Sequence, residues 1–249
     1  MSNRAQRHTR WSRALVIGAT GMCLLTLAAC GGDDDPDAPD DVAATSEPTP
    51  QDRLDQAYDT LSSAGSISLG MVGSDLPEGE SAYVISATGS GTLEPAAFDG
   101  TITAKIAGIQ ADVPAIAVDD RLYLELPFTG RYVDTDPDSL NVPDPAGLLD
   151  VETGLVSLLQ KTENPQFGEQ TRAGADVVQQ VSGTVPGDLI VDLLNAGQPD
   201  AQFDVVYGLV EETWETRTVT LTGPFYPPAE STYTVTLDDY GVPVDITAP

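Results

Sequence analysis

The feature that most constrains the fold is a succession of short alternating segments between residues 66 and 126. In the segments over 66–72 and 101–109 polar residues alternate with apolar ones, which is typical of β-strands that bury one face. Connections of only a few residues, such as the turn at Asp119 and Asp120, join the segments and favour antiparallel neighbours. The predicted strands cover residues 66–72, 82–88, 91–94, 101–109, 112–118 and 121–126.

The second half of the chain mixes helices with further strands. Asp144 followed by Pro145 is a typical helix start, because the aspartate can cap and the proline suits the first turn. We predict one or two helices over 145–160, kinked near Gly154. The other predicted elements are helices over 51–64 and 187–195, and strands over 165–172, 176–185, 202–210, 213–222 and 231–237. We therefore expect an α+β fold, with a large antiparallel sheet and a few helices on one face.

The N-terminal segment has the features of a bacterial secretory signal. Four arginines and no acidic residue precede an uncharged, mostly apolar run over 14–29. As a helix this run would be about 24 Å long. The bilayer core is about 30 Å thick, so a signal peptide is favoured over a short transmembrane anchor. The run ends in LAACG, which matches the bacterial lipobox. We expect cleavage after residue 29 and a diacylglyceryl group on the Cys30 thiol.

Cleavage would change what remains of the chain. It would remove Cys23 and also His8, which is the single histidine. Residues 30–50 hold seven acidic residues, four prolines and no aromatic residue, a composition that cannot bury a core. We predict that this segment is a lipidated, disordered tether and that 51–249 is one folded domain. The acyl chains on Cys30 would hold that domain on the extracytoplasmic face of the cell membrane.

The charge of the chain excludes some partners. The sequence has 39 Asp and Glu against 11 Lys and Arg, for a net charge of −28. Each phosphate contact with a nucleic acid needs a cation, so a nucleic acid is not expected as a partner. The same acidic excess argues against docking on anionic lipid headgroups through a basic patch. Contact with the membrane is instead expected through the lipid on Cys30.

The composition leaves few routes to catalysis, and we predict no catalytic residue. Without a histidine there is no Ser-His-Asp relay. Lys105 and Lys161 lie outside a Ser-x-x-Lys setting, and no glycine-rich phosphate loop occurs. The alternating aspartates over 134–138 lack the turn glycine and closing glutamate of a calcium loop, so a solvated loop is expected there. No metal or cofactor is predicted, and a hydrolase that uses two carboxylates stays open as an alternative.

A binding module is the remaining class of function. One predicted strand sets Ile102, Ala104 and Ile106 on one face, while the next strand leaves open which of its faces points inward. Small residues mixed with aliphatic ones can leave space between a curved sheet and its helices. The alternative is that the helices over 145–160 and 187–195 fill that space. The protein would then be a surface lipoprotein that acts through protein–protein contact.

Several stretches of the sequence carry a family resemblance. They are DPAGLLDVETGL at 144–155, GADVVQQVSGTV at 174–185, DDRLY at 119–123, GPFY at 223–226 and YGVPVDI at 240–246. In this order and beside a lipobox, they resemble the LppX/LprAFG family of actinobacterial cell-envelope lipoproteins. The resemblance covers nearly the whole mature domain.

The resemblance implies a curved antiparallel half-barrel that is packed on a few helices and encloses a hydrophobic cavity. It implies that the protein binds acylated lipids or glycolipids and carries them toward the cell surface, with a membrane transporter as a possible partner. With few cations in the domain, we expect a ligand that is neutral or held through its tails. The residues expected to line the cavity are Ile102, Ala104, Ile106, Ile116, Leu122, Leu124, Leu155, Leu158 and Leu159.

Overall fold

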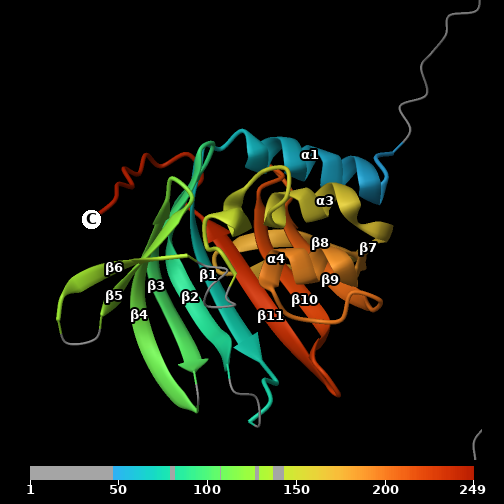
Figure 1. Ribbon diagram of the computed structural model, residues 1–249. Helices are drawn as coiled ribbons and strands as arrows, with labels where there is room; N and C mark the ends of the chain where they lie inside the picture. Colours follow the sequence, from blue (N-terminus) through green and yellow to red (C-terminus); the bar gives the residue numbers. More distant parts are fainter. Residues whose placement is uncertain (1–46, 79–81, 107, 127–128, 137–142) are drawn as a thin grey trace, which may run out of the picture. The chain divides into compact units, whose positions relative to one another are not determined.

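Figure 1 shows the computed structural model, which describes residues 47–249 apart from 79–81, 107, 127–128 and 137–142. The side chain of Ile106 also lies outside the described part of the chain. So do the predicted signal peptide, the lipobox with Cys30 and nearly all of the tether, which stay predictions.

The first described element is helix α1 (Pro50–Ser62), where the sequence predicts a helix. The hydroxyl of Thr49 accepts a hydrogen bond from the backbone N–H of Asp52 (3.2 Å), and the Asp52 carboxylate accepts one from the Thr49 N–H (2.7 Å). The two bonds form a capping box, and the bond that the Thr49 N–H donates to the carboxylate lowers the pKa of Asp52. One face of the helix is buried through Leu54, Ala57 and Leu61.

Eleven antiparallel strands form one curved, unclosed sheet. The first six strands are β1 (Ser66–Ser74), β2 (Ala82–Leu93), β3 (Ala96–Ile106), β4 (Ile109–Val118), β5 (Arg121–Leu126) and β6 (Arg131–Thr135). The other five are β7 (Glu163–Ala173), β8 (Asp176–Pro186), β9 (Gln202–Val210), β10 (Thr216–Tyr226) and β11 (Ala229–Asp238). This arrangement confirms the α+β class with a large antiparallel sheet.

The order of the strands shows two meanders joined at one seam. Neighbours follow the order β6-β5-β4-β3-β2-β1-β11-β10-β9-β8-β7. Every neighbouring pair is consecutive in sequence except β1 and β11, which pair with Met71 opposite Val235. In Figure 1 the first meander is coloured blue to yellow-green and the second orange to red. The strands β6 and β7 are therefore the two outer edges of the sheet, although they follow one another in the chain.

The chain must cross the width of the sheet between β6 and β7, and this crossing segment holds short helices. They are the 3₁₀ turns η1 (Gly147–Leu149) and η2 (Leu155–Ser157) and the helix α3 (Leu158–Lys161). Helix α1 packs on α3 and η2, while η1 packs on β2 and β3. Helix α4 (Gly187–Leu194) packs on β8 and β9. The helices thus cover the inner side of the curve (Figure 1).

The hydrophobic core joins both meanders with the helices in one cluster. On the second meander the core is tight, since Phe203, Val205, Tyr207 and Leu209 of β9 are fully buried. The ring of Phe203 lies 4.8 Å from that of Phe225 in an edge-on arrangement, which aromatic pairs favour. At β9 the inner side of the second meander is therefore filled by side chains.

One strand replaces two predicted ones in the first meander. The sequence Gly89-Ser90-Gly91 suggested a break between strands over 82–88 and 91–94, but β2 runs through it. The glycines are needed because the Phe98 ring lies across the pair Gly89 and Gly100, and a Cβ on Gly100 would come within 2.5 Å of that ring. These glycines allow the Phe98 ring to pack closely on the strand backbone, and they do not form a turn.

Other boundaries also differ from prediction. The segment 145–160 forms two 3₁₀ turns and one short helix turn instead of one or two α-helices, because its apolar residues pack on several sides. Gly91 lets this segment approach the sheet, since a Cβ there would clash with the Leu149 side chain. The pattern missed β6 altogether, and β3 begins five residues before the predicted start at Thr101.

Candidate functional site

The inner side of the first meander is not fully packed. An apolar pocket of about 190 Å³ lies there, between β1 to β5 and the start of the crossing segment. We call it the apolar pocket. It is lined by Leu69, Met71, Ala82, Val84, Ala87, Phe98, Ile102, Ala104, Val113, Leu122, Leu124, Pro143, Pro145 and Leu148. None of these described lining residues is polar or charged.

The strand register explains why these side chains meet. Ile102 of β3 lies opposite Val113 of β4, and cross-strand partners share a face of the sheet. The same face carries Ala104 on β3 and Ala87 on β2. Where the second meander places phenylalanine and tyrosine, this stretch of the first meander places alanines, so the sheet face is left partly uncovered.

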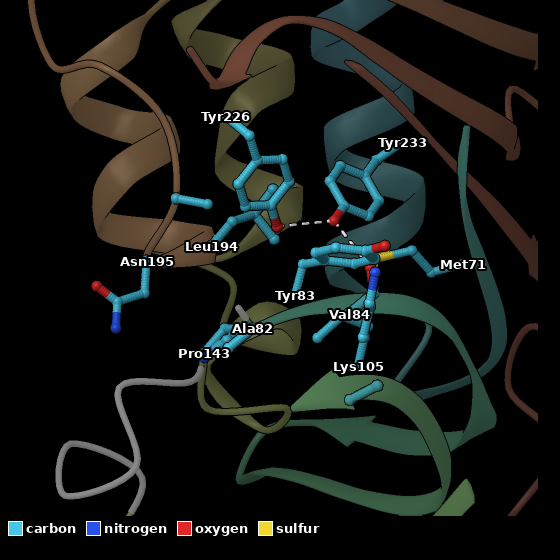
Figure 2. Close-up of a pocket in the computed structure, with 12 residues that line it drawn as sticks. Met71, Ala82, Tyr83, Val84, Lys105, Pro143, Leu194, Asn195, Tyr226 and Tyr233 are labelled. Carbon is cyan, nitrogen blue, oxygen red and sulfur yellow. Dashed lines mark hydrogen bonds between the residues drawn. The ribbon is translucent and has the colours of Figure 1, made fainter. Parts of the chain in front are cut away.

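A second pocket of about 110 Å³ adjoins the first and shares Met71, Ala82, Val84, Ala104 and Pro143 with it. We call it the tyrosine pocket. Its further lining residues are Tyr83, Lys105, Leu194, Asn195, Ala196, Tyr226 and Tyr233 (Figure 2). The two pockets therefore join an apolar region to a region with hydroxyls and an amine.

A chain of hydrogen bonds fixes the tyrosines of the second pocket. The Tyr233 hydroxyl donates to the Val84 carbonyl oxygen at 2.8 Å, so in the 2.9 Å contact with Tyr226 the latter donates to Tyr233 (Figure 2). Burial raises the pKa of Tyr233 well above its usual value, and the bond with Tyr226 adds to the shift. The Tyr233 phenol therefore stays neutral. The ring of Tyr83 lies 5.8 Å from that of Tyr226.

Lys105 is the charged residue of the tyrosine pocket. Its Nζ donates to the Glu78 carbonyl oxygen at 3.0 Å and lies 5.4 Å from the centre of the Tyr83 ring. Figure 2 shows the Lys105 side chain beside Tyr83. Among the described residues, no aspartate or glutamate lines either pocket. This is notable because residues 51–249 hold 32 acidic residues and only 7 basic ones.

The structure brings four of the predicted cavity residues together. Ile102, Ala104, Leu122 and Leu124 all line the apolar pocket. The prediction for Ile106 falls on a side chain outside the described part, and Cys30 lies outside it too.

Four other predicted residues do not line the apolar pocket. Ile116 pairs with Asp99 and Tyr123, so it lies on the outer face of β4 and not beside Leu122. The three leucines of the crossing segment, Leu155, Leu158 and Leu159, are buried in the core instead. Among them Leu155 lines only a cleft of about 20 Å³ against β1 and β11.

Sequence reasoning missed most of the tyrosine pocket. Lys105 was assigned to the polar face of its strand, with Thr101 and Thr103. It lies one residue from the end of β3, where its long side chain can bend toward the inner side. Tyr226 and Tyr233 come from the hairpin of β10 and β11, far away in sequence. The GPFY stretch contained Tyr226 but gave no sign of its partners.

A serine and a lysine also meet, in the crossing segment. Lys161 Nζ donates to Ser157 Oγ at 3.1 Å, and Ser157 donates its own proton to the Gly154 carbonyl at 2.8 Å. In a Ser-Lys nucleophile the lysine would accept the serine proton. Here the proton points away from the amine, so the contact acts as a structural hydrogen bond. Among the described residues no group of three or more His, Cys, Asp and Glu side chains could hold a metal ion.

Comparisons with known proteins agree on the fold. A family model described as LppX_LprAFG lipoprotein matches residues 49–246. The crystal structure of LprF from Mycobacterium bovis superimposes with a TM-score of 0.67 at 16% identity, covering 80% of this chain and 96% of that one. LppX from Mycobacterium tuberculosis gives a TM-score of 0.58 at 14% identity, covering 80% and 98%. No curated protein matches the sequence. Within the described ranges, no helix is long and apolar enough to cross a membrane.

Proposed function

The chain belongs to the LppX/LprAFG lipoprotein family, and on this premise we propose that it binds the acyl chains of a lipid or glycolipid in the apolar pocket. The observation that carries the proposal is the lining of that pocket, where fourteen residues contribute no polar or charged side chain. Each CH₂ group moved from water into such surroundings gains about 0.8 kcal/mol. A site of this kind favours hydrocarbon over any polar ligand.

The size of the pocket supports binding of part of an acyl chain. An engineered apolar cavity of about 150 Å³ stays dry and binds benzene, and the apolar pocket is about 190 Å³. A longer chain needs further apolar surface. Ile109, Leu126 and Val133 provide it, since the register sets them on the same sheet face as Val113 and Leu124.

These three residues are exposed, so their apolar side chains can contact an acyl chain that extends beyond the pocket. Ile109 is 72% exposed, Leu126 43% and Val133 40%. Large aliphatic side chains that continue an apolar pocket onto an exposed surface are typical of binding sites. We infer that acyl chains run from the pocket along the inner faces of β4 to β6, and that the bound chains complete a cavity between this sheet and the crossing segment.

The cellular role that we propose is lipid carriage. The diacylglyceryl group predicted on Cys30 would anchor the protein on the extracytoplasmic face of the membrane, where more than one acyl chain binds firmly. A twenty-residue tether spans about 25 Å root-mean-square, which lets the domain reach the bilayer surface. The protein would take an acylated lipid or glycolipid there and carry it toward the cell surface, receiving it from the membrane or from a membrane transporter.

Mass spectrometry of organic extracts tests this function. The protein is purified from its own cell envelope without a detergent that strips lipid. Its organic extract is compared with the extract of a control lipoprotein, which carries the same type of lipid anchor on an unrelated domain. We expect an acylated lipid in stoichiometric amount beyond the Cys30 modification. An extract that matches the control would reject lipid carriage and favour a lipoprotein that acts through protein contacts.

A further inference from the structure

The two adjoining pockets have an unusual charge distribution. Among the described residues, their lining contains one charged side chain, that of Lys105, and no carboxylate. Residues 51–249 hold 32 acidic residues, so most surfaces of this domain would be expected to carry some. The described lining of these pockets therefore repels an anion less than an acidic surface does.

Lys105 differs from two other cations of the domain, which are ion-paired. Arg217 is paired with Asp176, Glu215 and Asp238, and Arg121 is paired with Asp134. Within the described part of the chain, Lys105 forms no ion pair.

The donors of Lys105 are only partly used. Its hydrogen bond with a described residue goes to the Glu78 carbonyl oxygen. An ammonium group has three N–H donors, so two remain for a ligand.

We propose that Lys105 binds an anionic oxygen of the lipid headgroup, a phosphate or a carboxylate, while the acyl chains occupy the apolar pocket. This inference rests on the proposed function and names the headgroup class of the same site. Three tyrosines line the same pocket as Lys105, and their apolar rings with polar tips suit the part of a lipid where the headgroup meets the chains. The sequence alone led us to expect a ligand that is neutral or held through its tails, because the domain has few cations.

The position of the amine sets the geometry of the bound lipid. Ala104, the neighbour of Lys105, lines both pockets, so the headgroup and the first carbons of the chains would lie on adjacent residues of β3. The carbonyl oxygen of Glu78 accepts a hydrogen bond from the amine and holds it in place.

The test compares two lipids that differ only in the headgroup. Dihexanoyl phosphatidylglycerol and dihexanoylglycerol are titrated against a fluorescent fatty acid bound to the protein. We expect the wild-type protein to prefer the anionic lipid by about tenfold, the effect of a charge-assisted hydrogen bond at a partly exposed site. Lys105→Gln should bring the ratio of the two dissociation constants to about one and leave the affinity for dihexanoylglycerol unchanged.

Lys161→Gln is the matched control, since it removes the same charge from the other lysine, which lines neither pocket. It should keep the preference. If both lipids bind the wild-type protein equally, or if Lys105→Gln keeps the preference, the headgroup assignment is wrong while lipid binding stands. If neither lipid displaces the probe, the proposed function itself fails. Glycerol phosphate without chains should not compete, and competition at similar concentrations would assign the site to a free phosphate instead.

Discussion

The substitution Ala104→Trp is the most direct perturbation of the apolar pocket. Ala104 lies on β3 opposite Ala111 and Val84, and its side chain borders both pockets. A bulky ring at this position has open space in front of it, so it can enter the pocket without displacing the buried core of the second meander. We expect the variant to fold and to lose lipid affinity.

The size of the loss follows from the volume of the pocket. A methylene group is about as large as a water molecule, which occupies about 30 Å³ in the liquid. A pocket of about 190 Å³ therefore has room for roughly six methylene groups. At about 0.8 kcal/mol per CH₂ group, an indole that takes half of this space displaces about 2.4 kcal/mol of acyl-chain binding. Since about 1.4 kcal/mol is a factor of ten, the dissociation constant should rise by about fiftyfold.

The assay is displacement of a fluorescent fatty acid, with the thermal unfolding midpoint measured on the same samples. Thr101→Trp is the matched control, because Thr101 is exposed and lies on the same strand but on its other face. The control should bind like the wild-type protein. An Ala104→Trp variant that unfolds at the wild-type temperature and binds the probe with unchanged affinity would refute our placement of the acyl chains.

Three further predictions concern the scaffold and the anchor. Tyr207→Phe removes the hydroxyl that donates to Thr162 at 2.8 Å, so urea unfolding should show a loss of about 1 kcal/mol. Hydrogen bonds from Thr153 hold the pKa of Asp150 below its usual value. Asp150→Asn should therefore lower the free energy of unfolding at pH 7. The difference in this free energy between the variant and the wild-type protein should shrink below about pH 4, because acid protonates the wild-type carboxylate. Cys30→Ser should move the protein from the membrane fraction to the soluble exported fraction, as immunoblots of separated fractions would show.

Strand periodicity predicted most of the sheet because the second meander obeys a simple rule. On β9, the alternate residues Phe203, Val205, Tyr207 and Leu209 are all fully buried, so alternation in sequence reports directly on burial. The rule fails where both faces of a strand are apolar. On β4, the sequence allowed either Ala115 or Ile116 to face inward, and the larger residue proved to lie outside.

The crossing segment could not be predicted for a different reason. Its leucines recur at helical spacing, which favoured helices, but they pack against the sheet, α1 and α4. Gly91 on β2 makes room for Leu149, and no local pattern reports a contact between residues so far apart in sequence. The same limit applies to the tyrosine pocket, where Tyr83 and Tyr233 come from opposite ends of the domain.

The acidity of the domain and the cation of its pocket act at different ranges. The acidic surface repels an anionic lipid over about one Debye length, which is about 10 Å at 0.1 M salt. Lys105 acts only at hydrogen-bond distance, and no carboxylate lines its pockets to compete for it. Salt should therefore speed the association of an anionic lipid by screening the surface, while the preference that depends on Lys105 falls only modestly. Charge then controls access to the site, and apolar contact with the acyl chains supplies most of the affinity.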